Sequence, residues 1–195
     1  MTTDTTATPG RTRYEFRVWG DHRKARKTLA QIATHVTCET VEDCYLSVDD
    51  PSYNAKVRDN TLKVKRLLAH DKGFEKWGAA RHRAADSAPS PFDLVFDGLR
   101  LDRPQRGKSY DLAAEVSKLD PELDVTPVFV VKERRRYRIG TMRAEVTDIL
   151  VEESGRTLHT LSIDGDDLRE LVALRKRLGL KSETNLAVHQ AIAAA

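Results

Sequence analysis

Four basic residues on one predicted hairpin are the side chains of this sequence best suited to chemistry. They alternate with other residue types in the stretch NAKVRDNTLKVKRLL, residues 54–68, as Lys56, Arg58, Lys63 and Lys65. Side chains two positions apart in a strand point to the same face, so each strand presents its two cations together. Guanidinium and ammonium groups placed in this way bind phosphate oxygens. The hairpin therefore predicts a face that binds anions.

The turn of this hairpin decides which cations oppose each other. With Asn60-Thr61 as the tight turn, Arg58 lies opposite Lys63. Lys56 then lies opposite Lys65. Like charges directly opposed across a ladder destabilise it, so the pattern calls for a partner of opposite charge.

Two further predicted strands carry rows of cations. In VKERRRYRIG, residues 131–140, every second side chain is basic: Lys132, Arg134, Arg136 and Arg138. In RTRYEFRVWG, residues 11–20, Arg13 and Arg17 flank Glu15, and the other face is apolar. The ordinary alternative is a solvated face, because antiparallel sheets commonly keep one face in water. Such a face normally mixes the two signs of charge, whereas these strands concentrate Lys and Arg.

A few carboxylates sit among these cations: Glu15, Glu145 and Asp164. Glu145 pairs with Arg136 if Gly140-Thr141 is the turn, and this register favours Glu145 over Asp148 as the residue that faces the cations. Carboxylates can bind Mg²⁺ or Mn²⁺, which bridges phosphate groups and keeps some of its waters. The residues together predict a site for a polyphosphate–metal complex.

A barrel would bring these faces together. Antiparallel hairpins with helices between and after them predict the α+β class. If the charged faces curl inward, the strands make an antiparallel barrel with a polar bore. Amphipathic helices predicted over 22–35, 109–119 and 166–178 would cover the apolar outer faces. Residues 73–84, GFEKWGAARHRA, are expected to be helical or irregular, and a last helix is expected to begin at Ser182 or Thr184.

The ordered motifs resemble those of the CYTH superfamily, the triphosphate tunnel metalloenzymes. That family opens on Glu-x-Glu-x-Lys, and the matching stretch here runs from Arg13 to Arg17, RYEFR. Later stretches resemble the family's other motifs in the same order: EDCYLSV, KVRDNTLKVK, VKERRRY, AEVTDI and LSIDGDDLRELVALRKRLGL. The resemblance spans the chain from Arg13. It implies an eight-stranded antiparallel tunnel barrel with a charged interior and helices packed outside.

The resemblance also implies a function. A nucleoside triphosphate, inorganic triphosphate or polyphosphate would be bound in the tunnel and hydrolysed with Mg²⁺ or Mn²⁺. The residues implied to hold phosphate are Arg17, Lys56, Arg58, Lys63, Lys65, Lys132, Arg134 and Arg136. Those implied to hold metal are Glu15, Glu145 and Asp164, and no catalytic residue is assigned.

Two departures from the family pattern bear on activity. Arg13 and Ser162 stand where the family has acidic residues that hold metal. They leave two functions open: a metal-dependent phosphohydrolase, or a non-catalytic module of the same fold that binds a phosphorylated ligand. A cyclase and a phosphatase would also look alike at this level.

Composition limits the broader classes. The chain has 195 residues, 39% of them hydrophobic and 32% charged, with a net charge of +3. We expect a disordered tail over 1–10 and a single domain over 11–195. No apolar run is long enough to span a membrane, and Cys38 and Cys44 suit a reducing compartment, so we expect a cytoplasmic protein.

Nucleic acid is not the expected partner, because no strand rich in aromatic residues accompanies the cations. A homodimer is left open.

Overall fold

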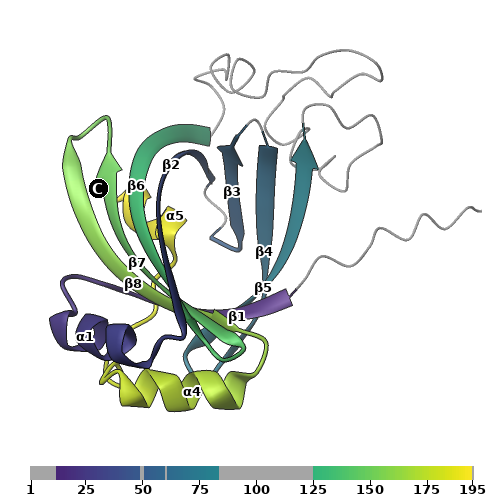
Figure 1. The fold of residues 1–195 in the computed structure, drawn as a ribbon. Helices are drawn as coiled ribbons and strands as arrows, with labels where there is room; N and C mark the ends of the chain where they lie inside the picture. Colours follow the sequence, from purple (N-terminus) through teal and green to yellow (C-terminus); the bar gives the residue numbers. More distant parts are fainter. Residues whose placement is uncertain (1–11, 49–50, 60, 84–124, 195) are drawn as a thin grey trace, which may run out of the picture.

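Eight strands form a closed antiparallel barrel in the computed structural model, which describes residues 12–48, 51–59, 61–83 and 125–194 (Figure 1). Around the barrel the strands follow the order β1-β5-β4-β3-β2-β6-β7-β8. Each strand pairs antiparallel with both neighbours, and β1 closes the barrel by pairing with β5 and β8. The predicted eight-stranded antiparallel barrel of the α+β class is therefore confirmed.

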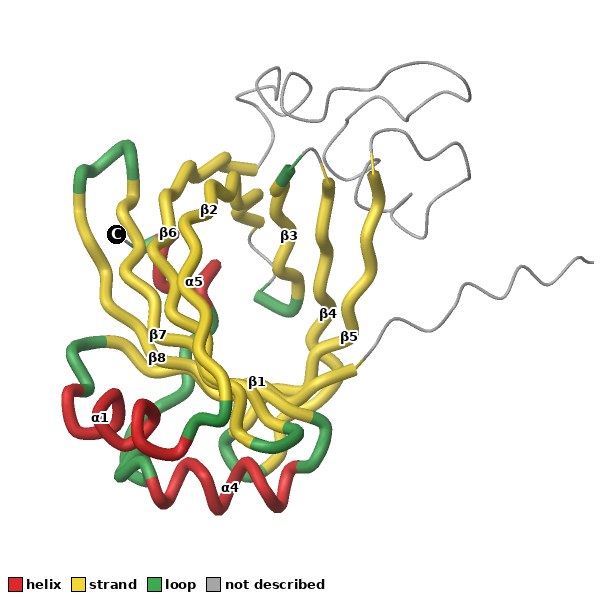
Figure 2. The backbone as a smooth tube through the Cα atoms, viewed as in Figure 1, coloured by secondary structure: helices red, strands yellow, loops and turns green. Residues whose placement is uncertain are grey.

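The strands and helices have the following bounds along the chain. They are β1 Thr12–Trp19, α1 Arg23–Ile32, β2 His35–Val48, β3 Tyr53–Arg58, β4 Thr61–Asp71, β5 Phe74–Arg83, β6 Val125–Ile139, β7 Met142–Val151, β8 Arg156–Gly165, α4 Leu168–Arg177 and α5 Val188–Ala193. Figure 2 shows the strands enclosing a central space, with α1 and α4 packed on the same side of the barrel. The predicted tail over 1–10 and the predicted helix over 109–119 lie outside the described residues.

Side chains alternate along the strands, so charged residues lie on the inner face of the barrel and the main apolar core lies on its outer face. On β1, Arg13, Glu15 and Arg17 line the interior cavity, while Phe16 and Val18 are buried on the outer face. The outer faces of β1, β7 and β8 join one hydrophobic cluster with side chains of two helices: Ala25 and Leu29 of α1, and Leu171 and Leu174 of α4. These helices therefore cover the barrel's outer face, as the sequence predicts for 22–35 and 166–178.

One acidic residue caps the start of α4, and one arginine near its other end contacts neighbouring segments. At the N-cap, the Asp167 carboxylate accepts hydrogen bonds from the backbone N–H groups of Arg169 and Glu170, a favoured arrangement at a helix N-terminus. Near the other end, Arg175 stacks 4.0 Å from the centroid of the Phe16 ring. Its guanidinium also donates to the carbonyls of Lys72 and Glu183. Arg175 thus ties the β4–β5 turn to the chain that leads to α5.

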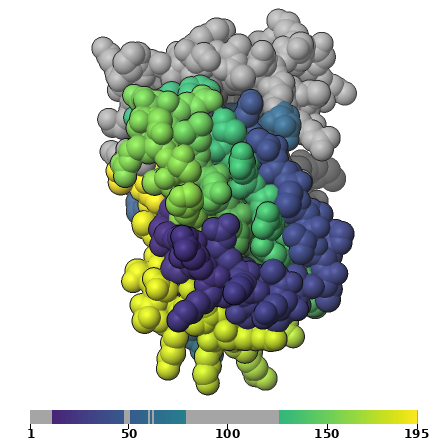
Figure 3. Space-filling model, turned by 60° about the vertical axis from the view of Figure 1, so that its left-hand side comes forward, coloured from purple at the N-terminus to yellow at the C-terminus, as the bar shows by residue number. Residues whose placement is uncertain are grey.

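The short helix α5 closes one end of the barrel. Its Val188 and Ile192 pack in a second hydrophobic cluster with inward-facing residues of three strands: Tyr45, Val128, Val130, Ile149 and Val151. In Figure 1 this helix is seen through the interior of the barrel, behind β2 and β6. Strands β6 and β7 are thus apolar inside near α5 and polar or charged farther along. The space-filling view in Figure 3 shows the outer face formed by α1 and the neighbouring strands.

The hairpin register differs from the predicted one. Arg58 is paired with Thr61, and Lys56 lies opposite Lys63. Lys65 lies opposite Asn54, so the turn begins one residue earlier than expected. Asp59 has a φ of +49°, in the left-handed region that Asp tolerates in turns. One pair of opposed like charges remains instead of two.

Two predicted helical segments are also wrong. The stretch beginning at Phe74 forms β5, whose Glu75 and Trp77 share a face as strand residues do. It follows a tight turn in which Lys72 and Gly73 both have positive φ. The last helix begins at Val188, with Ala187 as its N-cap, and not at Ser182 or Thr184. No helix within the described ranges has the length and apolarity that a membrane crossing requires.

The packing of α5 predicts a measurable contribution to stability. Replacing Ile192, which is 3% exposed, with Ala should lower the free energy of unfolding by about 2–5 kcal/mol, because a buried cavity is left behind. Urea denaturation followed by circular dichroism measures this change. Leu186→Ala is the matched control, since that side chain is 39% exposed and should change stability by less than about 1 kcal/mol. Equal losses in both variants would show that α5 does not seal the barrel.

Candidate functional site

The barrel encloses a cavity of about 640 Å³ with a strongly basic lining. Eleven of the lining residues are cationic, and they come from five strands: Arg13, Arg17, Lys56, Arg58, Lys63, Lys65, Lys132, Arg134, Arg136, Arg138 and Arg143. Three carboxylates share the lining: Glu15, Glu145 and Asp164. All eight residues predicted to hold phosphate and all three predicted to hold metal therefore meet in one cavity. Their roles there remain predictions.

A buried aspartate on β2 holds three of these cations. The Asp43 side chain has no exposed surface, and its carboxylate forms a two-point contact with the Arg58 guanidinium. Its Oδ2 atom also lies 2.9 Å from Lys56 Nζ and 3.1 Å from Lys132 Nζ. Burial acts to raise the pKa of Asp43, but the three cations outweigh it and hold that pKa well below its usual range.

Tyr45 lies beside this cluster and meets both lysines. The Lys132 ammonium donates to the Tyr45 hydroxyl oxygen and lies 4.4 Å from the ring centroid. The Lys56 ammonium lies 3.5 Å from the same oxygen. Burial, the largest influence, lowers the pKa of Lys132 to about 8, although Asp43 acts in the opposite direction. Burial and the charge of Lys132 lower the pKa of Lys56 as well. Both ammonium groups are therefore easier to deprotonate than a lysine in water.

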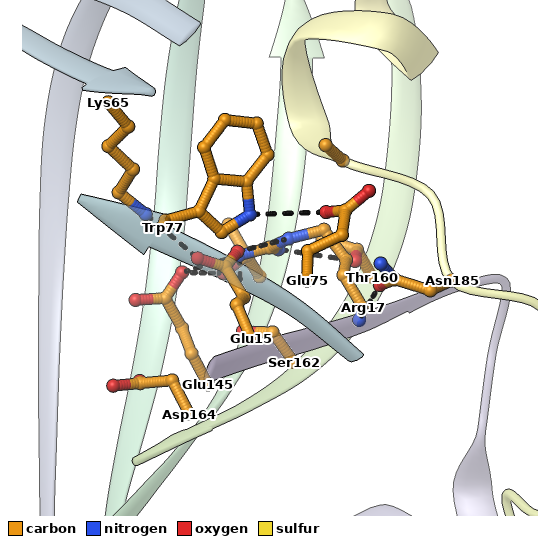
Figure 4. A network of polar contacts seen from close by, with 12 residues as sticks. Glu15, Arg17, Lys65, Glu75, Trp77, Glu145, Thr160, Ser162, Asp164 and Asn185 are labelled. Carbon is orange, nitrogen blue, oxygen red and sulfur yellow. Dashed lines mark hydrogen bonds and ion pairs between the residues drawn. The ribbon is translucent and has the colours of Figure 1, made fainter. Parts of the chain in front are cut away.

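The carboxylate of Glu15 is held between two cations (Figure 4). Lys65 Nζ donates to its Oε2 at 2.8 Å, and the Arg17 guanidinium donates to its Oε1 at 3.3 Å. Burial acts to raise the pKa of Glu15, but Lys65 and Arg17 outweigh it and leave that pKa well below its usual range. The same Arg17 donates to the hydroxyls of Ser162 and Thr160, which fixes its position on the wall.

The other two lining carboxylates are paired in the same way. Asp164 accepts from the guanidinium groups of Arg13 and Arg143, with Arg143 Nη2 at 2.6 Å. Glu145 lies 3.4 Å from Arg134 Nη1 and 3.5 Å from Arg136 Nε. The Arg136–Glu145 strand pairing follows the predicted register. Every acid assigned to metal thus already has at least two cationic neighbours.

Glu145, and not Asp148, faces the cavity, as predicted. Asp148 lies on the outer side of β7, where its carboxylate is 2.8 Å from His159 Nδ1. The strand alternation that decides this placement was visible in the sequence.

These side chains do not fit a divalent metal. Among the residues that the structure describes, no group of three His, Cys, Asp or Glu side chains is placed to hold an ion. Glu15 and Asp164 lie opposite each other in the β1–β8 register, but their oxygens are taken by Lys65, Arg17, Arg13 and Arg143. Mg²⁺ is bound by carboxylate oxygens, and here each cation already paired with those oxygens would compete with it.

Two residues that organise the wall are not among the site residues predicted from the sequence. Asp43 and Tyr45 belong to the EDCYLSV stretch, where their spacing of two puts them on one face of the strand. That spacing was a usable signal, but it gave no indication of which cations Asp43 meets. Arg143 and Trp77 also line the cavity and are likewise absent from the predicted site residues.

Comparisons with known proteins support the fold. No family model matches the chain, and no curated protein matches it. A conserved hypothetical protein of Pyrococcus furiosus has a similar solved structure, with 20% identity and a TM-score of 0.55 over 89% of this chain and 94% of that one. The PH1012 protein of Pyrococcus horikoshii matches with 16% identity and a TM-score of 0.55, over 92% of this chain and 98% of that one. Likenesses at this level of identity show a shared fold alone.

The Asp43 cluster predicts a large effect of a small substitution. Asp43→Asn should lower the free energy of unfolding by about 3–5 kcal/mol at pH 7, because it leaves three enclosed cations without their anion. The pKa of Asp43 is lowered in the folded state, so the contribution of its charge is complete above the unfolded pKa of about 4 and falls as the pH drops below it. The difference between the two proteins in urea denaturation should therefore shrink below pH 4. Asp148→Asn, on the outer side of β7, is the control and should change stability by less than about 1 kcal/mol.

Proposed function

We propose that this barrel binds a small molecule that carries a triphosphate group, such as inorganic triphosphate, a nucleoside triphosphate or the end of a polyphosphate chain. The observation that carries the proposal is the charge of the cavity, where eleven cations meet three carboxylates. Adding Asp43 and Glu39, which contact lining cations from the wall, raises the carboxylates only to five. The surplus positive charge calls for an anionic ligand with several charges.

The enclosure of these cations supports a small ligand over a nucleic acid surface. Arg17, Arg58 and Lys132 are buried, and Arg134 is 7% exposed at its side chain. Cations that contact a nucleic acid backbone lie on an accessible groove or face. The volume of about 640 Å³ lies in the range of small-molecule pockets, and α5 closes one end of the barrel.

The pairing of the carboxylates favours binding over hydrolysis. A hydrolase needs a group that orients or activates the attacking water. The three lining carboxylates instead each contact cations. We therefore place the non-catalytic binding module ahead of the metal-dependent phosphohydrolase. Phosphate release, measured with and without Mg²⁺ or Mn²⁺, separates the two.

Two neighbouring arginines on β6 provide a matched test of the proposal. Arg136 lines the cavity, whereas the next residue, Arg135, is exposed on the outer face. Arg136→Ala should weaken the binding of inorganic triphosphate about 10- to 100-fold in isothermal titration calorimetry, the loss expected for a charge-assisted contact. Arg135→Ala should leave the dissociation constant within about twofold. Equal affinities in all three proteins, or no binding by the wild type under any metal condition, would refute the proposal.

The lowered pKa of Lys132 predicts a pH dependence of binding. The free protein has a Lys132 pKa of about 8, and a bound polyanion favours the charged ammonium, so it raises that pKa. Above pH 8 binding must therefore take up a proton, and affinity should fall with rising pH. Lys132→Arg removes this titration because a guanidinium stays protonated.

The comparison is made by calorimetry between pH 7 and pH 9.5. Ionisation of the ligand itself is common to both proteins, so the difference between their slopes isolates Lys132. Above pH 8, the affinity of both proteins is followed as the pH rises. For each pH unit, the wild-type affinity should fall by up to about tenfold more than the affinity of the Lys132→Arg protein. Parallel pH profiles would show that Lys132 does not meet the ligand's charge.

A further inference from the structure

We infer that Arg13 and Arg143 take the place of a divalent metal in this cavity, so that the barrel binds triphosphate without one. The inference rests on the proposed triphosphate function and makes it more specific. Arg13 is assigned as a residue that excludes metal from Asp164 of β8.

The geometry places two guanidinium groups on the carboxylate that a metal would need. Asp164 contacts both Arg13 and Arg143, and Arg143 does so through Nε and Nη2 at 3.1 and 2.6 Å. Arg13 also lies 3.5 Å from Asp166. Across the strand pair, Glu15 faces Asp164 and is held by Lys65 at 2.8 Å. Glu15 and Asp164, two of the three candidate metal ligands, are thus neutralised from within the chain.

Displacing these cations would be unfavourable for an incoming ion. A metal at this place would have to break charge-assisted contacts that are among the stronger hydrogen bonds in proteins. It would also approach a lining with eleven cations and three carboxylates, and Mg²⁺ gives up its waters reluctantly. Repulsion at close range is considerable in a partly enclosed site.

Guanidinium groups can supply what the metal would supply for binding. A guanidinium has five donors in a planar fork that matches phosphate oxygens. Arg143 lines the cavity, and its side chain is 51% exposed while two of its nitrogens hold Asp164. A triphosphate can therefore have its charge neutralised and its oxygens bonded by the chain alone.

The first experiment compares triphosphate binding by the wild-type protein in EDTA and in Mn²⁺. Isothermal titration calorimetry is run with inorganic triphosphate, and affinities are compared at matched concentrations of the free ligand. The expected result is the same dissociation constant, within about threefold, in both conditions. Binding that appears only with Mn²⁺ would overturn the inference and leave the proposed function standing. Binding in neither condition would instead refute the proposed function.

The second experiment measures the metal alone. Titration of Mn²⁺ into wild-type protein, followed by electron paramagnetic resonance, should show no site with a dissociation constant below about 1 mM. Arg13→Glu frees Asp164 from one guanidinium and adds a third carboxylate, so it should gain Mn²⁺ binding at least tenfold tighter than the wild type. Arg138→Glu makes the same change of charge at another lining position and should gain none.

Triphosphate binding by the two variants also distinguishes the effect of the added negative charge from the effect of its position. In EDTA, triphosphate binding should weaken at least tenfold in both Arg13→Glu and Arg138→Glu. Mn²⁺ should restore it only in Arg13→Glu. A wild-type protein that binds Mn²⁺ tightly by itself would overturn the inference, as would a folded Arg13→Glu protein that gains no Mn²⁺ site. Circular dichroism confirms the fold of each variant.

Discussion

The interaction on which this barrel depends is the one between a single buried carboxylate and three cations. Turning rows of Lys and Arg inward creates repulsion that water screens poorly, so an anion enclosed with them stabilises the closed sheet. Asp43 is that anion for Arg58, Lys56 and Lys132, which come from two different strands. Arg58 and Lys56 lie on β3 beside Asp43 on β2, and Lys132 reaches it from β6 on the other side. The carboxylate thereby joins three neighbouring strands around one charge.

A second constraint gives the interior two ends of different character. On β6 the inward side chains change from Val128 and Val130 to Lys132 and Arg134. On β7 they change from Val151 and Ile149 to Thr147 and Glu145. The apolar end can be stable only when it is covered, and Val188 and Ile192 of α5 cover it. The C-terminal segment thus belongs to the site. Because α5 covers the apolar end of the barrel, an anion would enter from the charged end.

The sequence predicts those parts of this structure that depend on local periodicity. Cation rows with a spacing of two define the inward faces, and the place of Glu145 follows from the same rule. The predicted register of the hairpin is wrong by one residue. The observed register depends on the left-handed backbone conformation of Asp59, and several residue types can adopt that conformation in a turn. The role of Asp43 could not be predicted from the sequence, because its three partners lie 13, 15 and 89 positions away in the chain. Only the order of the strands in the barrel brings these residues into contact. The strand at Phe74 lacks regular apolar alternation, because Glu75 and Trp77 occupy its inner face.

The lowered pKa values of the enclosed lysines connect stability to selectivity. With its pKa at about 8, Lys132 can lose part of its charge near neutral pH, which reduces repulsion in the wall when no anion is bound. A ligand must therefore provide enough negative charge to favour protonation of the lysines as well as to attract the arginines. A monophosphate offers little of that charge, whereas a triphosphate can meet several strands of the cavity at once. Burial of the cations lowers the stability of the free protein. The same burial makes the cavity selective for ligands of high negative charge.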